Sequence, residues 1–308
     1  IMAFFSIKNF LKRSAFDIVH THSSKAGIIG RAAAKAAKIP VIVHTIHGQA
    51  FHRYEKPWKN WLYKTAERWA AKRSDKIFAV CQAMIDQALE AGIADPSKYK
   101  VVFSGMELEK FLTSSPDIEL RKQLGIPDGA PVVGSIARLF PLKGYEYFLP
   151  AAEIITSEFP DAFFLVVGDG ILTETIKAEA KRKKLNFVFA GLVPPDQIWR
   201  YCSIMDVLMH LSLREGLPRA VVQALASGKP AVGFSLDGTP EVIIPGKTGF
   251  LAEPKNAKSA AEQVIKLLQN PELADTLGEN GRKLAIKYFD WQKMCDVLED
   301  EYLKLINN

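Results

Sequence analysis

Residues 213–232 read LREGLPRAVVQALASGKPAV, and the order of elements in this stretch indicates the fold class. A strand is expected to end near Ser212, the dipeptide that begins at Glu215 makes a turn, and Pro218 suits the first position of a helix. Another apolar run, Ala231–Phe234, follows the helix and reads as a second strand. Strand, helix and strand in this order form a βαβ unit, whose two strands are parallel.

The same alternation extends along the rest of the chain. Short apolar runs that we expect to be strands lie at Asp17–His20, Val41–Ile46, Ile77–Cys81, Val101–Phe103, Val132–Ile136, Phe163–Val167, Phe187–Ala190, Val207–Leu211 and Ala231–Phe234. Longer helical segments separate them, among them Lys25–Lys38, Trp58–Lys72, Tyr145–Glu158 and Thr173–Lys184. The expected fold class is α/β with doubly wound parallel sheets, which places ligand sites at the carboxyl ends of the strands.

The length of 308 residues fits two domains. A stretch rich in Pro and Gly at 113–131 interrupts the periodicity, so we expect a first domain at 1–115 and a second at 116–290. A terminal helix at 291–308 is expected to pack back toward the first domain. The second domain has five or six expected strands, whereas the first has about four and opens on a helix at 1–16. We therefore expect an incomplete first domain and a chain that lacks an amino-terminal portion.

The composition is that of a globular protein. With 48% hydrophobic and 24% charged residues, a disordered chain, a collagen-like repeat and a coiled coil are excluded. No apolar run approaches the ~20 residues that a membrane-spanning helix needs, and the basic residues near the start follow the apolar stretch instead of preceding it. The three scattered cysteines, Cys81, Cys202 and Cys295, suit thiols in a reducing compartment. We expect a cytoplasmic protein.

Positive charge is concentrated in the first third of the chain. Residues 1–110 hold 18 Lys and Arg against 9 Asp and Glu, a net charge of +9, whereas the remainder holds 22 against 25, a net of −3. This asymmetry predicts that the first part meets an anionic partner. Nucleic acid, a membrane surface and a phosphorylated small molecule are all compatible with it.

The segment His52–Arg73 carries much of this charge together with three tryptophans. Its basic residues are Arg53, Lys56, Lys59, Lys64, Arg68, Lys72 and Arg73. Trp58, Leu62, Thr65 and Trp69 recur at helical spacing and form one largely aromatic face. That face can dock onto the sheet, or it can contact anionic lipid at a membrane interface. Nucleic acid is the weakest alternative, because no recognition module accompanies the charge.

Two loops at expected strand ends carry candidate site residues. In Ser135–Gly144, SIARLFPLKG, Arg138 and Lys143 follow a strand, where two cations can hold a diphosphate and stabilise it as a leaving group. The helix after Glu215 offers free backbone N–H groups to an anion or a sugar. Gln223, further along that helix, can both donate and accept hydrogen bonds. Taken singly, Glu215 is equally compatible with a solvated side chain in a plain βα turn, and Arg138 and Lys143 as isolated loop residues would more often be merely solvated.

The early histidines and a glycine-containing stretch at 168–170 give weaker predictions of a functional site. Five of the six histidines fall early in the chain, at His20, His22, His44, His47 and His52. His20 and His22 share a strand face, a spacing that metal ligands also use, but no cysteine joins them; structural hydrogen bonds, or a role for His47 in an active site, are better supported. The sequence GDG at 168–170 lacks the third glycine of a dinucleotide fingerprint, and no phosphate-loop motif is present.

Together these motifs resemble the family-4 retaining glycosyltransferases of the GT-B fold, over almost the whole chain. The matching stretches are DIVHTHSSKAG at 17–27, VHTIHG at 43–48, ARLFPLKG at 137–144, VVGDG at 166–170, FAGLV at 189–193, REGLPRAVVQALASGKP at 214–230, DGTPEVI at 237–243 and GKTGFLAEP at 246–254. The resemblance implies two Rossmann-like domains that face a cleft, and transfer of a sugar from a nucleotide-diphosphate donor. The glycine-rich loop with which family members begin is not found here.

The resemblance also implies roles for individual residues of the second domain. Arg138 and Lys143 would clamp the donor diphosphate. Glu215 would contact the transferred sugar, with the amides of Gly216 and Leu217 nearby.

Further residues are assigned by the same resemblance. His47 and Gly48 correspond to a His-Gly element close to the sugar and the acceptor. Gly170 and Leu192 fall in loops where the ribose and the base are expected. Many family members have a second Glu eight positions after the first, which holds the ribose; here that position is Gln223, which can bond hydroxyls but cannot act as a carboxylate.

The expected activity is that of a retaining glycosyltransferase, which takes a UDP-sugar and acts on a polysaccharide or lipid-linked glycan acceptor of the cell envelope. We expect front-face displacement without a metal or other cofactor, since no paired carboxylate favours double displacement. Two rivals stay open: a nucleotide-sugar 2-epimerase of the same fold, and a non-catalytic nucleotide-sugar-binding remnant. The expected location is cytoplasmic and peripheral, at the inner membrane face through residues 52–73, with no nucleic-acid partner.

Overall fold

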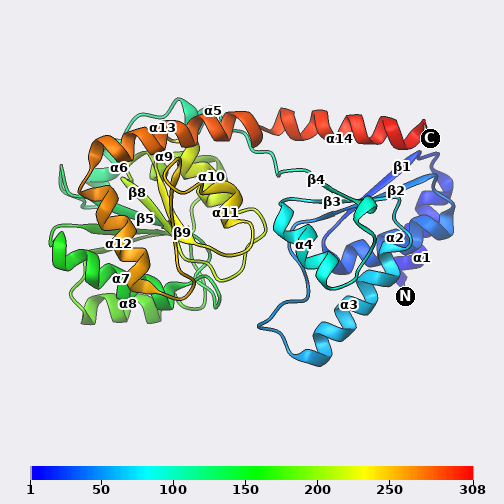
Figure 1. Cartoon of the computed structure of the whole chain (residues 1–308), viewed down its shortest axis with the longest axis horizontal. Coiled ribbons are helices and arrows are strands. Elements are labelled where there is room, and N and C mark those ends of the chain that lie inside the picture. The colour runs from blue at the N-terminus through cyan, green and yellow to red at the C-terminus, as the bar shows by residue number, and fades with distance from the viewer. Residues whose placement is uncertain (1, 308) are drawn as a thin grey trace. The chain divides into compact units, whose positions relative to one another are not determined.

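The computed structural model describes residues 2–307, and the chain divides into two compact units (Figure 1). The first unit is Ile1–Gly105 together with Trp291–Asn308, and the second is Met106–Asp290. The expected boundary at 115 lies ten residues too late. Residues 106–115 belong to the second unit, because the Met106 N–H donates to the Phe289 carbonyl at 2.9 Å and Phe111 is buried there.

The first unit contains a four-stranded parallel sheet in the order β1-β2-β3-β4. Its strands are β1 (Ile18–His22), β2 (Val41–Ile46), β3 (Lys76–Ala79) and β4 (Tyr99–Val101). Its helices are α1 (Met2–Arg13), α2 (Ser24–Ala37), α3 (Pro57–Ala71), α4 (Gln82–Glu90), the short 3-10 helix η1 (Pro96–Lys98) and α14 (Trp291–Ile306).

Alternate residues of β2 face two separate apolar clusters, as the period of a strand requires. Val41 and Val43 pack with residues of α14 such as Leu298. Ile42 points the other way and packs with Leu11 of α1 and Ala34 of α2. The sheet is therefore covered on both faces, which is the usual condition of a parallel sheet.

The second unit contains a six-stranded parallel sheet in the order β10-β9-β8-β5-β6-β7. Its strands are β5 (Val132–Ile136), β6 (Phe163–Val167), β7 (Phe187–Gly191), β8 (Val207–His210), β9 (Ala231–Phe234) and β10 (Gly249–Ala252). From β5 the strands run outward to β7, and the chain then returns to place β8 on the other side of β5. The sheet thus changes direction between β5 and β8, and a crevice outside the carboxyl ends of such a strand pair is the expected place for a ligand.

Helices cover this sheet, and α7 lies beside α12 while α10 lies beside α13 (Figure 1). The helical elements are α5 (Glu109–Leu112), α6 (Ile118–Gln123), α7 (Tyr145–Glu158), α8 (Thr173–Arg182), η2 (Pro195–Gln197), α9 (Ile198–Ser203), α10 (Arg219–Ala226), α11 (Thr239–Val242), α12 (Ala257–Leu268) and α13 (Pro271–Tyr288). In the core, the rings of Phe164 and Phe187 stack at a centroid distance of 5.1 Å, and Phe148 meets both of them edge-to-face at 6.3 and 5.9 Å. In the described part of the chain, no helix combines the length and apolar character needed to cross a membrane.

Candidate functional site

The change of direction between β5 and β8 brings two of the expected site residues together. Lys143 follows β5 and Glu215 follows β8, and the two strands are neighbours in the sheet. The Lys143 Nζ lies 2.6 Å from Glu215 Oε1, as a charge-assisted hydrogen bond. Both side chains keep some access to solvent, with exposed fractions of 21% and 15%.

The loop after β5 is held against the end of β8. The Leu213 N–H donates to the Leu142 carbonyl at 2.9 Å, and the Ser212 hydroxyl donates to the same carbonyl. Gly144 has a φ of +80°, and a Cβ atom there would lie 1.8 Å from the Leu211 carbonyl oxygen. Only glycine fits at this position, so the backbone next to Lys143 can approach the end of β8 closely.

Two further residues surround Glu215. The His210 Nε2, at the end of β8, lies 3.3 Å from Glu215 Oε1, and the Glu215 N–H donates to Asp237 Oδ2 at 2.9 Å. Burial raises the pKa of Glu215, but contacts with His210 and Lys143 outweigh it and lower that pKa to about 2. Glu215 is therefore a fixed carboxylate at neutral pH.

The sequence reasoning missed both His210 and Asp237. His210 is the last residue of the buried strand β8. A polar residue at the carboxyl end of a buried parallel strand is itself an indication of a ligand site, and the sequence shows it. Asp237 has a positive φ of 49° in the stretch DGTPEVI, and its role as a partner of the Glu215 backbone depends on that turn.

Arg138 does not join the pair formed by Lys143 and Glu215. It is exposed, and its guanidinium carbon lies 5.3 Å from the centroid of the Phe140 ring. Within residues 2–307, no carboxylate oxygen lies within ion-pair distance of Arg138. The loop of Gly170 lies alongside, since a Cβ atom at Gly170 would lie 2.6 Å from the Phe140 side chain. Gly170 and Arg138 therefore occupy adjoining loops.

The other expected donor residues are distributed over the same unit. Gly216 is half-buried and Leu217 is buried, just before α10, and Gln223 is half-buried within this helix. Leu192 follows β7 and is 84% exposed. Pro218 immediately precedes α10, whereas the sequence indicated that it would be the first residue of the helix.

His47 and Gly48 follow β2 in the first unit, and both are exposed. The His47 Nε2 lies 3.0 Å from Nδ1 of His22, the last residue of the neighbouring strand β1. His20 uses both ring nitrogens elsewhere: Nδ1 lies 2.5 Å from the Tyr302 hydroxyl and Nε2 lies 2.6 Å from Thr45 Oγ1. These bonds leave His20 without a nitrogen for a metal, and the structural alternative for this histidine is the better supported one. Among residues 2–307, no cluster of three His, Cys, Asp or Glu side chains has a metal-binding arrangement.

The aromatic face of α3 points away from the rest of its unit. Trp58, Trp61, Leu62 and Trp69 are 62%, 67%, 49% and 44% exposed, whereas the buried positions of the helix are those of Glu67, Ala70 and Ala71. The interpretation in which this face docks onto the sheet is therefore wrong. Periodicity identified the face but not the side of the helix that is buried.

Two family models match the chain. Residues 116–284 match the model described as glycosyl transferases group 1, and residues 2–105 match the model described as glycosyl transferase 4-like domain. The first match alone covers more than half of the chain.

Curated relatives extend over nearly the whole chain. It is 30% identical to UDP-Gal:alpha-D-GlcNAc-diphosphoundecaprenol alpha-1,3-galactosyltransferase of Escherichia coli, over 98% of this chain and 79% of the relative. It is 25% identical to the capsular polysaccharide biosynthesis glycosyltransferase CapM of Staphylococcus aureus, over 92% of this chain and 76% of the relative.

Solved structures show the same fold. The crystal structure of Anabaena Alr3699/HepE in complex with UDP gives a TM-score of 0.86 at 22% identity, over 98% of this chain and 82% of that one. A glycosyltransferase from Rickettsia africae ESF-5 gives 0.85 at 22% identity, over 99% and 81%. Two Rossmann-like units with parallel sheets, these structural likenesses and the family matches lead to one conclusion: the chain is a glycosyltransferase of the GT-B fold and belongs to the group 1 glycosyl transferases.

Proposed function

We propose that this glycosyltransferase is a retaining enzyme that moves a sugar from a UDP-sugar to a polysaccharide or lipid-linked glycan acceptor of the cell envelope. The observation that carries the proposal is the Lys143–Glu215 pair at the point where the second sheet changes direction. A cation there suits a diphosphate, and a fixed carboxylate suits the hydroxyls of a sugar. Further support comes from the printed name of the Escherichia coli relative, which specifies UDP-Gal and a diphosphoundecaprenol-linked acceptor.

In this proposal Lys143 and Arg138 bind the donor diphosphate. The Lys143 ammonium has three N–H donors, and within residues 2–307 only Glu215 accepts a hydrogen bond from it, so two donors are available to phosphate oxygens. Arg138 is exposed and can swing toward the same group. Glu215 accepts hydrogen bonds from the transferred sugar, with the backbone N–H groups of Gly216 and Leu217 alongside.

The remaining roles follow the family pattern. Gln223 bonds the ribose hydroxyls, and Gly170 and Leu192 border the ribose and the base. His47 and Gly48, from the first unit, contact the sugar and the acceptor. No metal or cofactor takes part in this scheme.

The stereochemical proposal is front-face displacement. The bond between the anomeric carbon and the UDP oxygen breaks, the acceptor oxygen bonds to the same face, and its proton passes to the released phosphate oxygen. Glu215 is bonded to Lys143 and lies close to His210, so it acts as a fixed charge and not as a nucleophile. The charges of Lys143 and Arg138 stabilise the leaving group.

A binding screen followed by product analysis tests this function. Thermal unfolding is measured with UDP, GDP, ADP and their common sugars, because a ligand at about 100 times its Kd adds about 2.7 kcal/mol. We expect a shift with UDP compounds and, with acceptor, a product whose anomeric configuration, measured by NMR, is that of the donor. An inverted product would overturn the retaining mechanism. Epimerised donor formed without acceptor would favour the epimerase, and binding without transfer or hydrolysis would favour the non-catalytic remnant.

We also propose that an anionic membrane surface, at the cytoplasmic face, is a partner of residues 52–73. The supporting observation is the exposed face of α3, which presents Trp58, Trp61, Leu62 and Trp69 to solvent between basic side chains. Tryptophan favours the interface between lipid and water, and Lys and Arg are attracted to anionic headgroups. Such a surface would bring the enzyme to a lipid-linked acceptor.

Vesicle sedimentation tests this partner. We expect binding to vesicles that contain phosphatidylglycerol and much weaker binding to pure phosphatidylcholine. The Trp58→Ala/Trp61→Ala double variant should bind about tenfold less or weaker still, because it loses the apolar part of the contact. Trp291→Ala is the matched control, since Trp291 is 46% exposed on a different helix. Equal sedimentation of the double variant and the control would overturn the proposal.

A further inference from the structure

The pair formed by His22 and His47 depends on where β1 ends. His22 is the last residue of β1, and its Nδ1 lies 3.0 Å from His47 Nε2. One of these two nitrogens must carry the proton, so the contact couples the tautomers of the two rings. The ring of His47 is thereby oriented by His22, and His22 is in turn placed by the turn that follows it.

That turn has a strained backbone. Ser23, between β1 and α2, has a φ of 62° and a ψ of 144°, a conformation that is rare for any residue with a side chain. Such a conformation persists only where neighbouring contacts fix it. The first of these contacts is local, since the Gly27 N–H donates to the Ser23 carbonyl at 2.7 Å.

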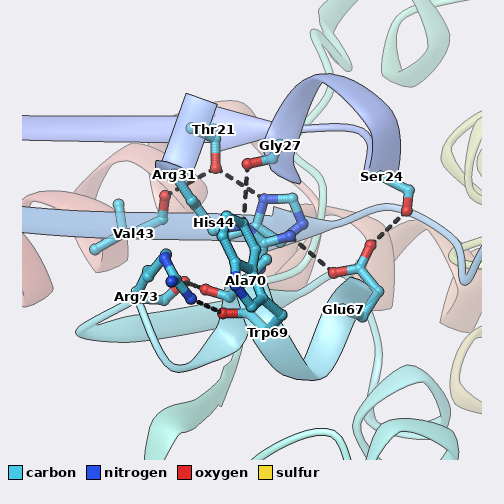
Figure 2. A network of polar contacts seen from close by, with 11 residues as sticks. Thr21, Ser24, Gly27, Arg31, Val43, His44, Glu67, Trp69, Ala70 and Arg73 are labelled. Carbon is cyan, nitrogen blue, oxygen red and sulfur yellow. Dashed lines mark hydrogen bonds and ion pairs between the residues drawn. The ribbon is translucent and has the colours of Figure 1, made fainter. Parts of the chain in front are cut away.

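The second contact comes from Glu67, on the buried side of α3 (Figure 2). The hydroxyl of Ser24, the first residue of α2, donates to Glu67 Oε1. The other carboxylate oxygen, Oε2, accepts from Arg31 Nη2 at 2.7 Å, and Arg31 Nε donates to the Gly27 carbonyl at 3.0 Å. Arg31 is only 1% exposed, so Glu67 is held firmly in place.

A third set of contacts ties β1 to β2, the strand that precedes His47. The Thr21 hydroxyl donates to the Val43 carbonyl at 3.2 Å and lies 2.9 Å from His44 Nδ1 (Figure 2). This fixes the alignment of the two strands. With the strands aligned, the direction in which the chain leaves β1 depends on the two contacts at the turn, the Gly27–Ser23 backbone bond and the Ser24–Glu67 bond.

We infer that Glu67 and Ser24 are positioning residues for the reaction: through the turn at Ser23 they place His22, which orients the ring of His47 toward the acceptor. The inference rests on the proposed role of His47. The inner side of α3 then positions His22 through Glu67, whereas its outer aromatic face has the separate, proposed role of membrane contact. Glu67 acts through Ser24 and His22 and touches neither donor nor acceptor itself.

Ser24 is the position at which to test this, because Glu67 variants would leave the buried Arg31 unpaired and strongly destabilise the first unit. Ser24→Ala removes the bond to Glu67 and keeps the ion pair. We expect its kcat to fall about tenfold, since small misplacements carry large rate costs, with an unchanged KM for the donor. Ser24→Thr, which retains the hydroxyl, should restore kcat. Ser14→Ala, which removes an exposed serine hydroxyl of the same unit, is the control.

Nitrogen-15 NMR of the histidine rings supplies a readout that loss of stability alone would not move. In Ser24→Ala the ring nitrogens of His22 and His47 should shift, whereas those of His210 in the second unit should not. An unchanged kcat, or a reduced kcat with unmoved ring resonances, would overturn the inference. If the wild-type chain transfers no sugar, the proposed function fails, and the ring resonances then test separately whether Ser24 and Glu67 place His22 and His47.

Discussion

The Arg31–Glu67 pair of the first unit and the Lys143–Glu215 pair of the second are both close contacts of a cation with a carboxylate, but they differ in what surrounds them. Arg31 and Glu67 in the first unit meet at 2.7 Å with exposed fractions of 1% and 11%. Lys143 and Glu215 in the second meet at 2.6 Å with 21% and 15%. In the first pair, both carboxylate oxygens have partners and the guanidinium also bonds a carbonyl. In the second, the ammonium keeps two donors unused within residues 2–307.

The comparison separates a pair that serves the fold from one that is available to a ligand. The Arg31–Glu67 pair is almost entirely removed from water, so removing one partner leaves a buried charge. The Lys143–Glu215 pair keeps access to solvent, so a phosphate or sugar can replace the water around it. Mutations that break the Arg31–Glu67 pair should therefore affect stability. Mutations that break the Lys143–Glu215 pair should affect binding or turnover.

Glu67→Ala should have the largest effect. Because Arg31 would be left as an uncompensated buried charge, we expect the free energy of unfolding to fall by about 3–5 kcal/mol. Urea unfolding measures this. The Arg31→Met/Glu67→Leu double variant is the control, and it should recover most of the loss because no charge remains. A single variant that unfolds at the wild-type urea concentration would show that the first pair is not structural.

Glu215→Gln should act on turnover. The amide keeps the size of the side chain but not its charge, and we expect kcat to fall by roughly 10²–10³, the range for one fixed electrostatic group. Calorimetry should give a nearly unchanged affinity for UDP, since Glu215 is assigned to the sugar. Full activity in this variant would remove Glu215 from the site.

Lys143→Ala should act on binding. Hydrogen bonds to charged groups contribute about 1.5–3 kcal/mol, so the affinity for UDP should fall roughly 10- to 100-fold in the same calorimetric titration. The free energy of unfolding should change by less than about 1 kcal/mol, as for other partly exposed ion pairs. Unchanged UDP affinity would contradict the assignment of Lys143 to the diphosphate.

Acid should affect the two units at different pH values. Burial lowers the pKa of His20 to about 4, and the charges of His22 and His47 contribute to this. Burial also lowers the pKa of His44 to about 2, with a contribution from the charge of Arg31. Unfolding restores a pKa near 6.5, so the unfolded chain binds protons first. As the pH falls below 6.5, the first unit should lose up to about 1.4 kcal/mol per pH unit for each histidine. Glu215, with a pKa of about 2, stabilises the second unit above pH 4.5 and loses that effect only as the pH falls from 4.5 to 2.

Tryptophan fluorescence separates the two responses. Four of the five tryptophans lie in the first unit, and Trp199→Phe removes the fifth. In that variant the urea midpoint should be lower at pH 5 than at pH 7. Equal midpoints would show that the buried histidines do not destabilise the first unit in acid.

Most of the fold could be predicted from the sequence, because strands and helices alternate with clear apolar periods. The expected strands Val41–Ile46, Val132–Ile136 and Phe163–Val167 coincide with β2, β5 and β6. β10 was not anticipated, since four residues beginning with a glycine carry too short a pattern. The burial of α3 could not be predicted either, because its apolar stripe faces outward and its inner face carries an ion pair.

The candidate site could be predicted in part. Lys143 and Glu215 follow strands in the sequence, but only the return of the chain from β7 to β8 makes those strands neighbours. The contacts of His210, Asp237 and His22 depend on backbone turns and on strand pairing, neither of which leaves a fixed spacing in the sequence. Sequence prediction was thus most successful where a residue's position follows from the end of its own strand.

The chain order of the first unit has a consequence for synthesis on the ribosome. Val41, Val43 and Phe78 form an apolar sheet face that α14 covers, and α14 is translated only after the whole second unit. At about 5–20 residues per second, that interval lasts roughly ten to forty seconds. During this time the second unit is free to fold, while the nascent first unit carries an uncovered hydrophobic surface. A chaperone that shields this surface would therefore raise the yield of folded enzyme most when it acts before translation is complete.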